Sequence, residues 1–178
     1  MSKGIAKNYF LPLLVLTAIC LVVSAALAMM DGITRPEIEA DAAIRTQRSM
    51  SEKIPEATGF EPLEPGSYDG MPATIRDIYK TTNDVGYVFI AAVNGFSGDI
   101  LIICGIDPDG KIIGTSTLAH TETKGIGTIL EQESFLGPFT GLDYGLEGID
   151  TVTGATISTR AFIRGINDIF TAFYLVES

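Results

Sequence analysis

Apolar and polar positions are unevenly distributed along the chain, and the first feature is a long run without charge. Residues 9–30 read YFLPLLVLTAICLVVSAALAMM and contain no charged side chain. As a helix rising about 1.5 Å per residue, this run reaches about 33 Å, enough to cross a hydrocarbon layer of about 30 Å. Lys3 and Lys7 precede the run and Asp31 follows it. The positive-inside rule therefore predicts a cytoplasmic N-terminus and an extracytoplasmic remainder.

A cleaved signal peptide is the alternative interpretation of the same run. Ala26-Leu27-Ala28 has the small-x-small pattern of a cleavage site. The apolar run, however, is longer than the usual apolar region of a signal peptide, about 7–15 residues. We therefore favour a retained membrane anchor, and a mature chain that begins at Met29 would contradict it.

The pattern after the apolar run predicts a short helix and then loops. Pro36 suits the first position of a helix over residues 36–50, and Thr34 is its candidate cap. Residues 55–72 are rich in proline and glycine, which favours loops. The predicted organisation is a cytoplasmic N-terminus (1–8), a transmembrane helix (9–30), a membrane-proximal helix and loop (31–73), and an extracytoplasmic domain (74–178).

Strand patterns dominate residues 74–120. Residues 74–80 alternate partly, while 87–93 (YVFIAAV) and 100–106 (ILIICGI) are apolar on both faces, as buried strands are. Asp107-Pro108-Asp109-Gly110 has the residues of a tight turn, and residues 111–118 return as the partner strand. We expect an antiparallel sheet built from hairpins.

The end of the chain has a helical period, and an irregular stretch precedes it. From Thr121 onward many glycines interrupt the pattern, and long irregular segments within a domain are usually functional. Within Ser158–Val176, apolar residues recur at helical spacing: Phe162, Ile163, Ile166, Ile169, Phe170 and Phe173. The predicted fold class is α+β, an antiparallel sheet with packed helices.

Charge and cysteine content exclude several classes of protein. Residues 31–178 hold 10 basic and 22 acidic side chains. A general nucleic-acid binder would show a basic stripe, so no nucleic-acid partner is expected. Cys20 lies in the apolar run and Cys104 in a predicted strand. We therefore expect no intramolecular disulfide, and we interpret Cys104 as a buried apolar residue.

The segment with the clearest chemical potential lies directly before the last predicted helix. Residues 150–159 read DTVTGATIST, and five of these ten residues carry a hydroxyl group. Gly154 and Ala155 are small enough for a ligand to approach the backbone. The start of the following helix offers free N–H groups, which favour a phosphate. The plainer interpretation is a capped helix, with Thr156 or Ser158 as the cap.

This segment resembles the flavinylation motif of the FMN-binding domain family through Asp150, Thr153, Gly154, Ala155 and Thr156. In that family the last threonine is esterified by the phosphate of FMN, and the matching position is Thr156. The layout of the whole chain is similar to the G subunits of Rnf electron-transport complexes. The C subunits of Na+-translocating NADH:quinone reductases are similar but usually longer.

A second motif supports the same resemblance. Residues 120–127, HTETKGIG, resemble the family's H-x-E-T-P-G-x-G loop, with Lys124 in place of the proline. Gly125 and Gly127 let the backbone pass close to a planar ring. Glu122 and Thr123 can hydrogen-bond the flavin. A lone histidine is more often structural, but the motif makes His120 a candidate contact.

The resemblance implies an electron carrier with covalent FMN in a membrane complex that links ferredoxin oxidation to an acceptor such as NAD, coupled to ion transport. Other membrane subunits, the membrane and a flavin transferase acting on FAD with Mg²⁺ are the implied partners. We assign no catalytic residue and no metal. The alternatives are an anchored docking domain without a cofactor and a stand-alone flavoprotein reductase. Phe135, Phe139 and Tyr144 are possible stacking partners for a flavin, although ordinary core packing explains them as well.

Overall fold

The computed structural model describes residues 3–178 except 124, 126 and 147, and it leaves out the side chains of 3–9, 36 and 39. By its internal contacts the chain divides after Ile44 into an N-terminal part and the unit Arg45–Ser178. Lys124, the departure from the family loop, lies outside the described residues.

Helix α1 (Lys3–Lys53) begins in the N-terminal part and ends in the second unit. One stretch of it is long and apolar enough to cross a membrane, and none of that stretch is buried within the structure. The helix continues through residue 36, so the helix predicted over 36–50 is its last part. Thr34 does not cap a new helix; its hydroxyl donates to the carbonyl of Met30 at 2.9 Å.

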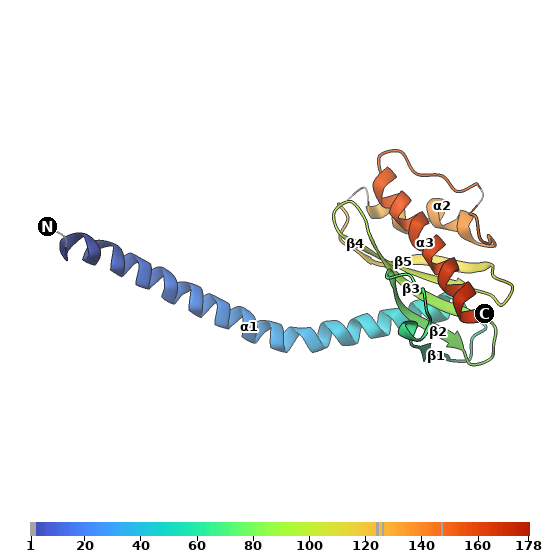
Figure 1. Cartoon of the computed structure of the whole chain (residues 1–178), viewed down its shortest axis with the longest axis horizontal. Coiled ribbons are helices and arrows are strands. Elements are labelled where there is room, and N and C mark those ends of the chain that lie inside the picture. Colours follow the sequence, from blue (N-terminus) through green and yellow to red (C-terminus); the bar gives the residue numbers. More distant parts are fainter. Residues whose placement is uncertain (1–2, 124, 126, 147) are drawn as a thin grey trace. The chain divides into compact units, whose positions relative to one another are not determined.

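Five antiparallel strands form one sheet in the order β1-β2-β3-β4-β5 (Figure 1). The strands are β1 (Phe60–Leu63), β2 (Ile75–Thr81), β3 (Tyr87–Asn94), β4 (Asp99–Ile106) and β5 (Ile112–His120). The antiparallel sheet is confirmed, and so is the turn before β5, where Gly110 adopts a φ of 82°. Strand β1 was missed because it lies among the prolines. Pro62 is compatible with it because β1 is an edge strand.

Helix α3 (Thr156–Glu177) lies across one face of the sheet and confirms the predicted C-terminal helix (Figure 1). Its apolar side includes Phe162, Ile166 and Phe170, which are fully buried in one cluster with residues of β3 and β4. Cys104 is in the same cluster, and burial raises the pKa of its thiol to about 12. The buried, apolar role predicted for Cys104 is confirmed.

The end of α1 packs on the other face of the sheet. Met50, together with Ile54 just after the helix, joins a second cluster with residues of β3 and β4. Gly105 and Gly114 are register partners on β4 and β5. A Cβ at Gly105 would lie 3.0 Å from Ile54, and one at Gly114 3.2 Å from Lys53. These paired glycines let the helix end approach the sheet, and β3 and β4 are buried on both faces for this reason.

Three short helical turns occupy part of the stretch predicted to be irregular. They are η2 (Gly127–Glu131), α2 (Glu133–Leu136) and η3 (Gly137–Phe139). Each is too short to show a helical period in the sequence. Phe135 and Phe139 point into the core, where both rings lie 5.4–5.5 Å from the ring of Phe162. The segment therefore covers the sheet beside α3, completing an α+β fold.

Candidate functional site

The segment before α3 is shaped by a buried threonine. Gly154 has a φ of 89°, and the N–H of Ala155 donates to the carbonyl of Val152 at 3.0 Å. The hydroxyl of Thr159 accepts from the N–H of Val152 at 3.2 Å and donates to the carbonyl of Ala155 at 3.0 Å. The buried Thr159 hydroxyl thus links Val152 to Ala155 by hydrogen bonds and stabilises the loop before α3, a role that no pattern in the sequence indicated.

Helix α3 begins without a side-chain cap. Its N-cap residue is Ala155, which has no side-chain group that could accept from the first amides. The predicted capping roles are wrong: Thr156 Oγ1 donates back to the Val152 carbonyl, and Ser158 Oγ donates to Glu122. The first turn of α3 therefore keeps the unsatisfied N–H groups that favour an anion.

Thr156 is half-buried and lines a cavity of about 300 Å³. Its hydroxyl lies 3.4 Å from the Val152 carbonyl, a long and weak hydrogen bond. The residues lining this cavity, called here the Thr156 cavity, are Phe96, Gly154, Ala155, Thr156, Ile157 and Ser158. The side chains of Phe96 and Ile157 are 61% and 56% exposed, so the cavity has apolar borders open to solvent.

Glu122 connects three segments behind this cavity. Its Oε1 accepts from the backbone N–H groups of Phe96 at 2.7 Å and Ser97 at 3.1 Å, while its Oε2 accepts from Ser158 Oγ at 2.7 Å. Burial by itself raises the pKa of the Glu122 carboxyl. The hydrogen bonds from Ser158, Ser97 and Phe96 outweigh burial, so the pKa lies below its usual value. Glu122 therefore stays ionised and holds the β3–β4 turn against the start of α3.

His120 and Thr123 stabilise the loop that contains Glu122 and follows β5. The N–H of Glu122 donates to His120 Nδ1 at 3.2 Å, and His120 Nε2 faces Glu131 Oε1 at 3.2 Å. Thr123 Oγ1 and Ser97 Oγ lie 3.1 Å apart, which adds a second link to the β3–β4 turn. Gly127 packs so close to the His120 ring that no Cβ fits there. Gly125, with a φ of 97°, is exposed.

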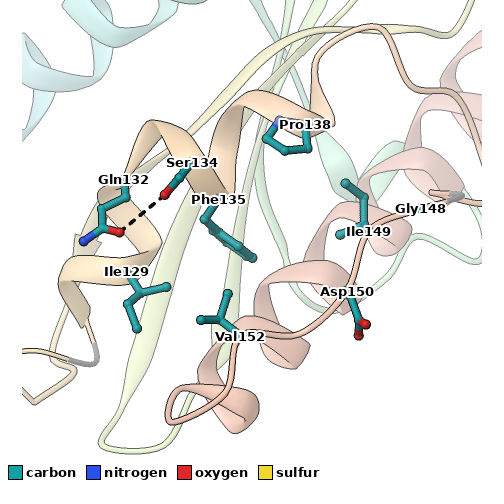
Figure 2. Close-up of a pocket in the computed structure, with 9 residues that line it drawn as sticks. All are labelled: Ile129, Gln132, Ser134, Phe135, Pro138, Gly148, Ile149, Asp150 and Val152. Carbon is teal, nitrogen blue, oxygen red and sulfur yellow. Dashed lines mark hydrogen bonds between the residues drawn. The ribbon is translucent and has the colours of Figure 1, made fainter.

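The remaining motif residues are on the surface. Thr153, Gly154 and Asp150 are exposed, and the Asp150 carboxylate accepts from the N–H of Thr151 at 2.7 Å. Asp150 also borders a second cavity, of about 370 Å³, on which Ile129, Phe135 and Val152 converge (Figure 2). Thr156 does not line this second cavity, so the two cavities use different residues of the motif.

None of the three aromatic residues considered from sequence lines the Thr156 cavity. Phe139 is fully buried and Phe135 nearly so. Tyr144 packs against Phe170 and Tyr174, with ring centroids 6.1 and 5.9 Å away. At about 1.5 Å per residue, Phe170 lies about 21 Å along α3 from Thr156. The aromatic residue that lines the cavity is Phe96, whose only sequence signal is its place between Gly95 and the Ser97-Gly98 pair.

The arrangement combines a hydroxyl nucleophile with an uncapped helix start and two apolar side chains. An ester-linked phosphate would accept hydrogen bonds from the first amides of α3, because these amides have no side-chain partner at the N-cap. A planar apolar ring attached to that phosphate would find Phe96 and Ile157 at the cavity border. The residues present therefore fit a phosphorylated aromatic cofactor.

Comparisons with known proteins agree with this chemistry. The family described as "FMN-binding domain" matches residues 95–171. The G subunit of an "Ion-translocating oxidoreductase complex" from Methanosarcina acetivorans is 29% identical over 93% of each chain. The G subunit of the "Proton-translocating ferredoxin:NAD(+) oxidoreductase complex" from Clostridium ljungdahlii is 27% identical over 86% of this chain and 85% of its own. Its counterpart in the "Na(+)-translocating ferredoxin:NAD(+) oxidoreductase complex" of Acetobacterium woodii is 26% identical over 86% of each.

Proposed function

We propose that this chain is an electron-transfer subunit that holds FMN covalently on Thr156. The proposal is supported by the match of residues 95–171 to the FMN-binding domain family and by the resemblance to the G subunits of ion-translocating oxidoreductase complexes. The observation that carries the proposal is the Thr156 cavity. It joins a weakly bonded hydroxyl, the uncapped start of α3 and an apolar border.

Within this proposal, each motif residue has a distinct role. Thr156 provides the ester oxygen, and the backbone at Gly154 and Ala155 lies against the phosphate, because neither residue has a side chain that would block it. Thr153 and Asp150 are exposed before the helix, where a modifying enzyme can bind and recognise them. The proposed site is completed by four residues at the end of β5 and in the loop after it, which fix its position: His120, Glu122, Thr123 and Gly125. FMN supplies one-electron transfer chemistry when it is bound.

Attachment requires a separate flavin transferase, with FAD as donor and Mg²⁺ as its cofactor. Thr156 Oγ1 forms the new bond to the FMN phosphorus while the bond from that phosphorus to the AMP oxygen breaks. The hydroxyl proton leaves to a base of the transferase, and AMP is the leaving group. The half-buried position of Thr156 leaves its oxygen within reach from solvent before the flavin is attached. A covalent ester then prevents loss of the cofactor on the extracytoplasmic side of the membrane.

The proposed setting is a membrane complex with several other subunits. The C. ljungdahlii and A. woodii relatives carry names that specify ferredoxin and NAD(+) as reactants, one with protons and the other with Na(+). The two relatives share one activity, which we extend to this chain. It is electron transfer from ferredoxin to an acceptor such as NAD, coupled to ion translocation. The apolar stretch of α1 anchors the chain with its N-terminus in the cytoplasm and Arg45–Ser178 outside.

Replacing the proposed attachment residue tests the covalent link. Thr156→Ala removes the oxygen that we propose forms the ester, so full-length protein purified from its native host should lose the bound flavin completely. The measurement is intact mass, which for the unaltered protein should exceed the sequence mass by FMN less one water. In-gel flavin fluorescence under denaturing conditions should disappear with the added mass.

Two matched variants make the result specific. Thr156→Ser retains a hydroxyl at the same position and should keep the flavin. Thr151→Ala removes a neighbouring hydroxyl at a variable position of the motif and should also keep it. Covalent flavin on Thr156→Ala would overturn the assignment of the site. Absence of flavin from the unaltered protein in its native host would favour the docking-domain alternative.

A further inference from the structure

The turn between β3 and β4 places an aromatic side chain at the Thr156 cavity. Phe96 is at the tip of this turn, closed by a hydrogen bond from the Gly95 N–H to the Gly98 carbonyl at 2.8 Å. Phe96 is 61% exposed. A polar residue at the same hairpin tip would be exposed to water at a lower cost in free energy. Ile157, directly after Thr156, is the other exposed apolar residue at the cavity.

The tip is held in place by Glu122 rather than by packing of Phe96 itself. Glu122 accepts from the N–H groups of both Phe96 and Ser97. Gly95 lies so close to the Glu122 carboxylate, and Gly98 so close to the Thr121 side chain, that neither position has room for a Cβ. The two glycines thus let the turn sit directly on the loop after β5.

The same carboxylate also fixes the start of α3. Its second oxygen accepts from Ser158, two residues beyond Thr156, at 2.7 Å. One buried group therefore sets the position of Phe96 relative to Thr156. Such a fixed spacing is unnecessary for a surface turn, but it is needed if Phe96 must meet a group attached to Thr156.

We propose that Phe96 is the residue that packs against the isoalloxazine ring of the flavin, and that Glu122 is the positioning residue that holds Phe96 over the cavity. The inference rests on the proposed attachment of FMN to Thr156. The tethered ring is the occupant of the apolar border because its phosphate is fixed within the cavity. Packing on Phe96 and Ile157 shields one part of the ring from water and limits its orientations.

Iodide quenching of flavin fluorescence in the full-length, flavin-bearing protein measures this shielding. Stacking on an aromatic side chain shifts a docking equilibrium by about tenfold or more. Phe96→Ala should therefore raise the quenching constant several-fold toward that of free FMN, while Phe96→Leu, which keeps apolar contact, should raise it less. Intact mass should show the flavin on every variant.

Tyr144→Ala is the matched control. Tyr144 is 61% exposed, like Phe96, but it packs on the far part of α3. Its loss should leave quenching unchanged. An equal effect of Phe96→Ala and Tyr144→Ala, or no effect of Phe96→Ala on a protein that still carries flavin, would overturn the proposal. That outcome leaves Thr156 as the attachment site, whereas missing flavin on the unaltered protein would reject the site itself.

A double-mutant cycle separates positioning by Glu122 from a general structural role. Glu122→Gln should raise quenching when Phe96 is present, because the amide cannot act as an ionised acceptor for both segments. In the Phe96→Ala background the same change should add little, since there is no ring contact left to lose. Equal increments in the two backgrounds would contradict the positioning role, and the charge change itself is identical in both.

Discussion

Among single residues, Glu122 should make the stability of the domain depend on pH. Its pKa is lowered in the folded protein, so it contributes stability above its unfolded pKa of about 4.3. This contribution is lost as the pH falls through the lower, folded pKa. Glu122→Gln should lower the free energy of unfolding by about 1–3 kcal/mol at neutral pH, because a charge-assisted acceptor is removed.

Thermal unfolding of the full chain in detergent at neutral pH and at an acidic pH below the lowered, folded pKa of Glu122 measures this effect. The difference between the unaltered protein and Glu122→Gln should be large at neutral pH and small in acid. Glu61→Gln, a change of the same type on the exposed part of β1, should behave like the unaltered protein at both values. A constant deficit at both pH values would show that the carboxylate charge is not responsible.

Residue roles differed in how far the sequence could predict them. Thr156, Gly154 and Ala155 are neighbours in one motif, so their grouping at one cavity needed no knowledge of the fold. Phe96 is 60 positions from Thr156, and no local pattern connects the two. The capping role given to Ser158 was wrong because its hydroxyl donates to a tertiary partner, Glu122, and that given to Thr156 was wrong because Thr156 is already inside the helix and donates back to the Val152 carbonyl.

At the scale of elements, the contact between α3 and the sheet depends on a glycine. A Cβ at Gly165 would lie 2.6 Å from Ile102 Cδ1 and 2.9 Å from Val93 Cγ1. Gly165→Val should therefore overpack this contact and cost about 1–3 kcal/mol. The expected result is a fall of about 5 °C in the unfolding midpoint of the full chain.

Arg160→Ala, on the exposed side of the same helix, serves as the comparison and should shift the midpoint little. Thermal unfolding followed by circular dichroism measures both variants. An unchanged midpoint for Gly165→Val would mean that α3 can move away from the sheet without cost. Flavin attachment should persist at low temperature, because Gly165 lies about two and a half turns along α3 from Thr156.

Elements with a clear hydrophobic pattern were predicted best. Strands β3 and β4 and helix α3 were all expected, because burial on both faces gives a strand an unbroken apolar run and burial of one side gives a helix apolar residues three or four positions apart. Strand β1 and the turns η2, α2 and η3 were missed, since each has only three to five residues. Short elements owe their form to tertiary contacts, such as those of Phe135 and Phe139 with Phe162.

At the scale of the whole molecule, the orientation in the membrane is the testable feature. The C-terminal Ser178 is exposed, so a cysteine placed there offers an accessible thiol. Ser178→Cys in intact cells should react with a membrane-impermeant maleimide if the domain lies outside. Labelling only after the membrane is opened would place the domain in the cytoplasm and reject the proposed topology.

The two natural cysteines give a low background in this experiment. Cys104 is fully buried, and burial raises the pKa of its thiol to about 12, so it is almost entirely unreactive at neutral pH. Cys20 lies within the apolar stretch of α1.

The intact mass of the purified protein distinguishes a retained anchor from a cleaved signal peptide. A retained anchor gives an intact mass that includes the residues before Met29.

The sequence by itself determined the features that depend on neighbours along the chain: the apolar span, the apolar strands, the periodic last helix, and the motif that ends at Thr156. Local patterns suffice there because spacing alone sets which side chains share a face or a turn. Only the tertiary structure decided which distant groups meet. It brought the Phe96 turn, the Glu122 carboxylate and the start of α3 together, since a buried carboxylate must find donors wherever the fold supplies them.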